Sequence, residues 1–166
     1  MLVAGCAGES SPSTQNDVLE LLDVSQHSNS ALMRGDVDRY REIVEYAEDF
    51  TLFSPFGGEP TRGMTPERFA RMGRFFKNGV HKQEVVSTYH VDDMVVLALI
   101  ERPHVSVAGL PEQEWALRVT LVYRKDNGKW RLVHRHADPL SHGITHAHAA
   151  EHANGTGVGN GEGAVK

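Results

Sequence analysis

The sequence predicts an α+β domain in which helices pack on one face of an antiparallel sheet. Three observations support this class. Helical patterns fill the first half of the chain, β-rich segments fill the second half, and Asn127-Gly128 separates the last two of these segments. An Asn-Gly pair between two strands is typical of a tight hairpin turn, and helices followed by a run of hairpin-linked strands are typical of α+β folds.

Three helices are expected, over residues 16–33, 37–47 and 65–78. Asn16 or Asp17 can cap the first helix, and Gly35 stops it. Asp36 is the expected N-cap of the second helix. The third begins at Thr65-Pro66-Glu67, which supplies a cap, a proline in the first turn and an acid near the positive end of the helix dipole.

Five strands are expected around and after the third helix. A short strand over 50–53 runs into the loop 54–60, whose proline and glycine residues cannot continue a helix or a strand. Four longer strands follow, over 84–90, 94–102, 115–124 and 130–136, all rich in β-branched or aromatic residues.

The last hairpin determines which side chains share a face of the sheet. A two-residue turn pairs Asp126 with Lys129 and places His134 opposite Leu121. The core face then carries Leu117, Val119, Leu121, Tyr123, Trp130, Leu132, His134, His136 and Asp138, and the opposite face carries Arg118, Thr120, Arg124, Arg131 and Arg135. A three-residue loop would instead group Arg118 with His134 and His136, but the cleaner separation of apolar residues favours the two-residue turn.

Length and composition predict one domain, residues 16–140, between two disordered ends. The chain has 166 residues and a formal net charge of -5, which argues against nucleic acid as a partner. Its single cysteine excludes an internal disulfide and a zinc site built on several cysteines.

The N-terminal segment, 1–15, is expected to be disordered, and it leaves the cellular location open. Val3-Ala4-Gly5-Cys6 resembles a bacterial lipobox, but the sequence shows no basic and apolar signal region before it. The sequence as written therefore predicts a cytoplasmic protein. A cell-envelope lipoprotein anchored through Cys6 is the alternative if the true start lies upstream, and a membrane is a partner only in that case.

The C-terminal segment, 141–166, is rich in glycine and histidine and is also expected to be disordered. His142 and His146 are four residues apart, as are His148 and His152, a spacing that can bind Zn, Ni or Cu on a transient helix. Fixed carboxylate or thiolate ligands are missing nearby, so no physiological metal site is predicted.

The motifs of the predicted domain resemble a known superfamily. Gly35-Asp36, the segment 46–49, Ser54-Pro55-Phe56-Gly57-Gly58 and Arg62-Gly63 resemble the front half of nuclear transport factor 2-like proteins. The segments 118–123 and 130–140 resemble their SnoaL-like members, so the resemblance spans about 17–140. It implies a cone-shaped curved antiparallel sheet wrapped around three helices, a fold shared with cystatin-like proteins. Such a fold encloses a pocket and is usually a homodimer through the sheet.

The same resemblance argues against ketosteroid isomerase activity. In those isomerases the catalytic base is an aspartate immediately before the Pro-Phe-Gly loop, and here that position is Ser54. Matching strands places the second catalytic acid near Val119 or Thr120, so it is missing as well. A serine hydroxyl has no useful basicity near pH 7 without its own activating base.

The residues that could form a site gather in the loop 54–58 and on the last two strands. His134, His136 and Asp138 are the candidate acid–base groups, because histidine titrates near neutral pH and a carboxylate can orient it. Arg118 and Arg135 are candidates for a dimer interface or for anion binding. The candidate ligand-binding residues are Ser54, Phe56, Tyr123, Trp130, His134 and His136. No Gly-x-Gly-x-x-Gly motif follows a strand, so no dinucleotide or other cofactor is predicted.

Three functions follow from these residues. The first is binding of a small apolar or aromatic molecule in an internal pocket, without established catalysis. The second is a hydrolase, cyclase or isomerase that uses His134, His136 or Asp138. The third is a homodimerisation module. Fold alone does not choose between them.

Overall fold

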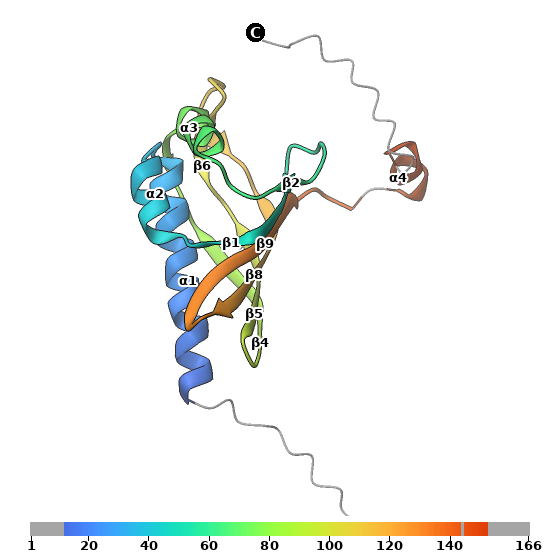
Figure 1. Cartoon of the computed structure of the whole chain (residues 1–166). Helices are drawn as coiled ribbons and strands as arrows, with labels where there is room; N and C mark the ends of the chain where they lie inside the picture. The colour runs from blue at the N-terminus through green and yellow to red at the C-terminus, as the bar shows by residue number, and fades with distance from the viewer. Residues whose placement is uncertain (1–11, 144, 153–166) are drawn as a thin grey trace, which may run out of the picture.

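A strongly curved β-sheet and three helices on one side of it form the domain (Figure 1). The computed structural model describes residues 12–143 and 145–152. The helices are α1 (Pro12–Met33), α2 (Val37–Ile43), α3 (Pro66–Phe75) and α4 (His146–His152). The strands are β1 (Tyr46–Phe53), β2 (Thr61–Arg62), β3 (Phe76–Val80), β4 (Gln83–Val91), β5 (Met94–Glu101), β6 (His104–Val107), β7 (Gln113–Glu114), β8 (Leu117–Asp126) and β9 (Lys129–Pro139).

The main sheet has six strands in the order β2-β1-β9-β8-β5-β4 and is mixed rather than antiparallel throughout. β1, near the start of the domain, runs parallel to β9 at its end, whereas the other neighbouring pairs are antiparallel. The expected α+β class and curved sheet are confirmed, but the expectation of a purely antiparallel sheet was wrong. A parallel pair needs a long crossover, and most of the domain lies between these two strands.

Local signals placed the starts of α2 and α3 and the end of α1 correctly, but α1 begins at Pro12, before the expected caps Asn16 and Asp17 and inside the segment expected to be disordered. Asp36 caps α2 by accepting a hydrogen bond from the Arg39 amide at 3.1 Å, and Thr65 caps α3 through the Arg68 amide at 3.3 Å. α1 ends where Gly35 takes a positive φ of 83°, and a Cβ there would lie 3.0 Å from the carbonyl oxygen of Phe76. Glycine avoids both the strain and the close contact.

Both short helices end earlier than the sequence pattern indicates. α2 stops at Ile43, and the segment predicted as its last turn begins β1, where Tyr46 pairs with Leu132 of β9. α3 stops at Phe75, and the next five residues form β3, which pairs with β6. In both places pairing with a distant strand outweighs local helix propensity. β3, β6 and β7 form a second, three-stranded sheet that the sequence analysis did not predict.

The last hairpin confirms the turn but corrects the register beyond it. Asp126 pairs with Lys129 around a two-residue turn in which both residues have positive φ, as expected. A bulge then follows: Tyr123 faces Leu132, but Val122 faces His134, so Val133 is the extra residue. One extra residue reverses the faces of the rest of a strand. His134 and His136 therefore lie on the outer face of the sheet, opposite the helices, and Arg135 points inward.

The core lies between the helices and the inner face of the sheet. Alternate residues of β5 and β8 are buried there, and Phe50 and Leu97 are among the most deeply buried side chains. α1 contributes a stripe that includes small polar residues, of which Ser25 and Ser28 are buried. Small side chains let the helix lie close to the strands.

The two ends of the chain are only partly described by the structure. Cys6 and residues 1–11 lie outside the described residues, as do 144 and 153–166. Part of the segment expected to be disordered, His146–His152, is the short helix α4. Within the described residues there is no group of three or more potential metal ligands. None of the helices in the described ranges is long and apolar enough to cross a bilayer.

Candidate functional site

A cavity of about 260 Å³ opens between the helices and the inner face of the sheet. Its walls come from the end of α1, from α2, α3, β1, β6 and the loop after β1. Its apolar lining includes Leu32, Met33, Phe50, Leu52, Phe56, Met64, Met72, Phe75, Phe76, Val105, Val107, Trp115 and Leu117. Pockets for drug-sized molecules span roughly 300–1,000 Å³, and this cavity lies just below that range.

Phe56 stands at the mouth of the cavity and is about half exposed. Its ring meets Phe75 edge-on at 5.5 Å and Trp115 at 5.8 Å between centroids. The loop that carries it is held by Ser54, whose side-chain oxygen accepts from the Phe56 amide at 3.2 Å and whose carbonyl accepts from the Gly57 amide at 3.0 Å. This loop places an aromatic side chain over the opening.

The polar end of the cavity, which we call the floor, is built on an ion pair between Glu101 and Arg135. Two hydrogen bonds of 2.9 and 2.7 Å join the guanidinium to the carboxylate, and Asn29 donates a third at 3.3 Å. Glu101 is only 2% exposed, and all three residues line the cavity. Burial alone would raise the pKa of Glu101, but the charge and hydrogen bonds of Arg135 outweigh it and hold the pKa below its usual value.

Tyr40 and Tyr46 supply the other polar atoms that line the cavity at this end. Their hydroxyls are hydrogen-bonded to each other. Burial raises the pKa of Tyr40 and, more strongly, that of Tyr46, so both are neutral near pH 7. The Tyr46 ring is held edge-on by Phe50 at 4.6 Å and by Phe69 at 5.8 Å. A neutral hydrogen-bonded pair of tyrosines retains one hydroxyl proton that can be donated to a third group.

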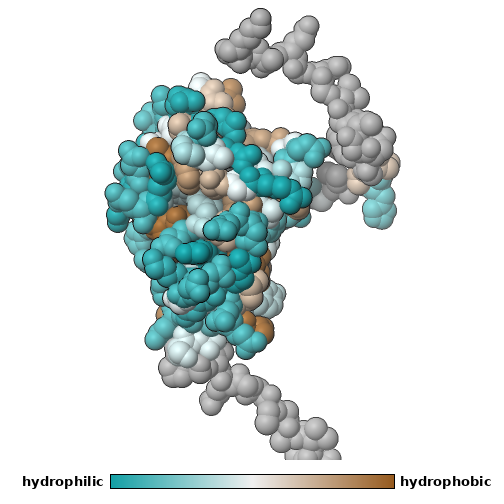
Figure 2. All heavy atoms as spheres, viewed as in Figure 1, coloured by the Kyte–Doolittle hydropathy of each residue, from teal (hydrophilic) through white to brown (hydrophobic). Residues whose placement is uncertain are grey.

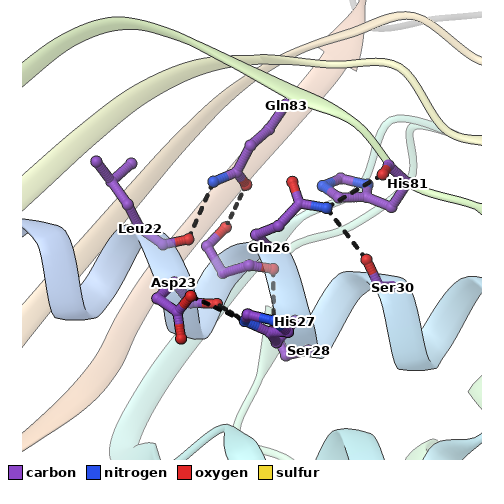
Figure 3. Close-up of polar contacts among 9 residues, drawn as sticks. Leu22, Asp23, Gln26, His27, Ser28, Ser30, His81 and Gln83 are labelled. Atoms are coloured by element: carbon purple, nitrogen blue, oxygen red, sulfur yellow. Dashed lines mark hydrogen bonds and ion pairs between the residues drawn. The ribbon is translucent and has the colours of Figure 1, made fainter.

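Polar contacts between α1 and the start of β4 hold the helix in place beside this floor (Figure 3). Ser25 donates to the Gln83 side chain at 3.0 Å, and Gln83 donates to the Leu22 carbonyl at 3.0 Å. Gln26 donates to the backbone carbonyl of His81 at 3.1 Å. Burial lowers the pKa of the His81 imidazole, which favours its neutral form.

The sequence profile of the SnoaL-like domain matches residues 22–140, well over half of the chain. The chain belongs to the SnoaL-like domain family. That range contains the whole cavity and both sheets, so the family assignment covers the candidate site. The comparison with curated proteins found no match to the chain.

Solved structures similar to this SnoaL-like domain support the fold. A protein of unknown function with a cystatin-like fold from Nostoc punctiforme has 22% identity and a TM-score of 0.60, over 76% of this chain and 92% of that one. A candidate dehydratase of the nuclear transport factor 2-like family from Streptomyces avermitilis has 15% identity and a TM-score of 0.63, over 78% and 99%. The association domain of C. elegans CaMKII has 19% identity and a TM-score of 0.57, over 77% and 99%.

The expected ligand-binding residues of this SnoaL-like domain divide between two places. Ser54 and Phe56 line the cavity, and so does Arg135, which was expected on the opposite face. Tyr123 and Trp130 lie away from it, beside a second and more polar hollow near the start of α1. There the Trp130 indole donates to Asp17 at 3.2 Å.

The expected acid–base residues of the SnoaL-like domain lie on the outer face of the sheet. His134 shares a hydrogen bond of 2.7 Å with the Thr51 hydroxyl, and its ring meets Phe53 edge-on at 5.0 Å. His136 meets the same phenyl ring at 5.3 Å. Asp138 is paired with Arg118 across the strands rather than with a histidine. The residues that line the cavity do not include His134, His136, Asp138 or Arg118. The prediction that Arg118 and Arg135 share a face was therefore wrong, because the bulge at residue 133 separates them.

Sequence reasoning missed the floor of the cavity. Tyr40, Tyr46, Asn29 and Glu101 were not among its candidates. For Glu101 a signal was available: residues 95, 97 and 99 of the same strand are apolar and inward, so period-two alternation places a carboxylate inward at 101. A buried charge at the end of an apolar alternation predicts a partner charge nearby.

Proposed function

We propose that this SnoaL-like domain binds a small, largely apolar or aromatic molecule in the cavity above the Glu101–Arg135 pair. The observation that carries the proposal is the division of the cavity into aromatic and aliphatic walls and one polar end. Binding sites for small molecules commonly combine an apolar lining with a few converging polar groups that orient the ligand. The ligand's apolar body lies against the walls, and its polar group faces the floor.

The tyrosine pair gives the ligand's polar group a specific partner. Tyr40 and Tyr46 both line the cavity and are neutral near pH 7. The proton that the pair does not use internally is available to a carbonyl, ether or hydroxyl oxygen of the ligand. A ligand without an acceptor would leave this buried donor unsatisfied, which costs about 1–3 kcal/mol.

Binding rather than catalysis is proposed because no lining residue among those described is suited to exchange a proton near pH 7. The pKa values of the tyrosines are raised by burial, and Glu101 is held as a carboxylate by Arg135. The alternative of an enzyme that uses His134, His136 or Asp138 finds no support, because these residues lie on the opposite side of the sheet.

A fluorescence titration with the neutral probe N-phenyl-1-naphthylamine tests this proposal. Met72→Trp places an indole in the cavity wall, so we expect it to reduce the probe's affinity by about tenfold or more. Leu19→Trp is the matched control, because Leu19 is exposed on α1 and does not line the cavity. The proposal would be contradicted if wild type and both folded variants bound the probe with equal affinity. It would also be contradicted if neither this probe nor a set of small aromatic ketones and alcohols bound to any of the three proteins.

A second proposed function is self-association through the outer face of the sheet. The helices lie on the other side (Figure 1), and Figure 2 shows hydrophobic residues along the edge where β4 and β5 lie. Tyr89 and Val91 of β4 are 59% and 68% exposed, and Val96 and Val122 continue the same face on the neighbouring strands. A contiguous apolar face of this kind is typical of an interaction surface. The structural likeness to the association domain of C. elegans CaMKII is compatible with self-association.

Analytical ultracentrifugation over a range of concentrations tests self-association. We expect wild type to form dimers at micromolar concentration and Tyr89→Lys to remain monomeric, because the substitution places a charge in the centre of an apolar contact. Leu19→Lys removes an equally exposed apolar side chain from α1 and should leave the dimer intact. A wild-type protein that sediments as a monomer at all concentrations would contradict this second proposal.

A further inference from the structure

The ion pair at the floor of the cavity joins a buried carboxylate to an arginine that keeps part of its side chain exposed, 19% for Arg135. Glu101 is 2% exposed, yet it lines the cavity together with Arg135. Replacing a buried ion pair by apolar residues is often neutral or stabilising, so stability alone does not account for such a pair. Its position at the polar end of a binding cavity points instead to ligand selection.

The ion pair leaves the arginine little net positive charge with which to attract a ligand anion. Arg135 reaches from β9 across β8 to Glu101 at the end of β5, and both oxygens of the carboxylate are engaged. The carboxylate occupies one edge of the planar guanidinium in this two-bonded arrangement and neutralises its charge, while N–H donors remain on the other edges. The same Glu101 oxygen that Arg135 contacts also accepts from Asn29, so the carboxylate is held from two elements.

We infer that Glu101 is a built-in anion that occupies the carboxylate-binding site of Arg135, so that the cavity selects uncharged ligands over carboxylates of the same shape. This inference rests on the proposed binding function and specifies its ligand class: a small neutral apolar molecule with a hydrogen-bond acceptor. A ligand carboxylate would meet the negative charge of Glu101 at close range in largely apolar surroundings, where repulsion between like charges is stronger than in water. Without the Glu101 charge, the same floor would present an unpaired guanidinium and would favour an anion.

A second arginine at the cavity, Arg71, could also bind a ligand anion, so the experiment needs a control for it. Arg71 also lines the cavity but is exposed at its rim, on α3. It could hold a charged group at the water boundary without involving the floor. The probes are therefore short and rigid, and they differ only in charge: 2-naphthamide and 2-naphthoate, each measured by displacement of N-phenyl-1-naphthylamine.

In wild type we expect 2-naphthamide to bind about tenfold or more tightly than 2-naphthoate. Glu101→Gln keeps the shape and an acceptor for Arg135 but removes the charge, so the affinity for 2-naphthoate relative to that for 2-naphthamide should rise by about tenfold or more. Asp138→Asn is the matched control, because it frees Arg118 on the outer face and should alter neither affinity. Adding Arg71→Gln to Glu101→Gln should leave the gain for 2-naphthoate in place.

Three results would overturn the inference. One is a wild type that binds 2-naphthoate as tightly as 2-naphthamide. Another is a folded Glu101→Gln variant with no gain for 2-naphthoate relative to 2-naphthamide. The third is a gain that disappears with Arg71→Gln, which would assign anion binding to the rim.

A measurement that needs no cavity ligand separates failure of this inference from failure of the proposed function. Glu101→Ala leaves room beside Arg135 for a free carboxylate, so its thermal midpoint should rise by a few degrees with sodium acetate relative to sodium chloride at equal ionic strength. Wild type and Asp138→Ala should show no such rise. If no neutral probe binds wild type, the proposed function fails, and the acetate series alone tests the role of Glu101. An equal rise in thermal midpoint with acetate in all three proteins would overturn the role of Glu101 as the built-in anion.

Discussion

At the scale of single residues, Arg135, Glu101 and His81 are polar side chains that the fold holds inside the molecule. Each has a shifted pKa, and the causes differ. The mutual attraction of Arg135 and Glu101 overcomes the effect of burial on both, so the pair stays charged. For His81 burial is the largest influence and lowers the pKa, although the nearby Glu101 carboxylate acts in the opposite direction. His81 is therefore the side chain in this group most easily disturbed by acid.

His81 should make the folded state sensitive to mild acid. An unfolded histidine takes up a proton near pH 6.5, whereas folded His81 does so only at lower pH, so unfolding binds a proton in the window below 6.5. The free energy of unfolding should fall as the pH falls through this window, by up to about 1.4 kcal/mol per pH unit. Urea unfolding at about pH 7.5 and about pH 5.5 should show a smaller loss for His81→Gln than for wild type.

The exposed His104 provides the control for this pH effect. His104→Gln should lose as much stability as wild type between the two pH values. If His81→Gln and His104→Gln lose the same amount, the acid sensitivity does not come from the buried imidazole.

At the scale of elements, the bulge at Val133 decides which chemistry reaches the cavity. The turn at Asn127-Gly128 alone would keep a regular register and send His134 inward. The extra residue instead sends Arg135 inward, where it meets Glu101, and leaves His134 against Thr51 on the outer face. A single inserted residue thus replaces two histidines by one arginine on the inner face.

Inserting an alanine between Val133 and His134 should reverse this exchange. With the bulge kept at Val133, the added residue moves His134 inward and turns Arg135 outward, so Glu101 stays buried without its partner, and an uncompensated buried charge alone costs about 3–5 kcal/mol. We expect the insertion variant to lose most of its cooperative urea transition. Deleting Val133 removes the bulge but keeps His134 opposite Val122 and Arg135 opposite Leu121, so this variant should lose only about 1 kcal/mol. An insertion variant as stable as the deletion variant would show that the register does not hold Arg135 in place.

Features set by residues close together in the sequence could be predicted, and features set by distant residues could not. Asp36, Thr65 and the Asn127-Gly128 turn act within a few residues of themselves, and the elements they start or connect were predicted correctly. The ends of α2 and α3 are set by pairing with distant strands, which local propensity does not record. The bulge left no such signal, because Val133 suits either register. For the site, Ser54, Phe56 and Arg135 were among the candidates, although Arg135 was expected on the opposite face, and the other floor residues were not.

At the scale of the whole molecule, the curved sheet separates two surfaces with different proposed roles. The helices lie on its inner side (Figure 1). The cavity lies between them and the inner face, while the outer face presents the apolar residues proposed for self-association. Ligand binding and dimer formation can therefore occur together, since neither surface needs the other's residues. Four of the chain's five methionines lie within the described residues and can report on this separation. Met33, Met64 and Met72 line the cavity, whereas Met94 is exposed on the sheet.

Methyl NMR of protein labelled at the methionine methyl groups tests binding in the cavity most directly. On titration with 2-naphthamide, the account predicts that the signals of Met33, Met64 and Met72 shift together with one dissociation constant, while the Met94 signal stays in place. Single substitutions of Met33, Met64, Met72 and Met94 by leucine assign the four signals without a large change in volume. A saturable shift confined to Met94, or three cavity methyls that do not respond at a probe concentration near its solubility limit, would contradict the claim that this cavity is the binding site.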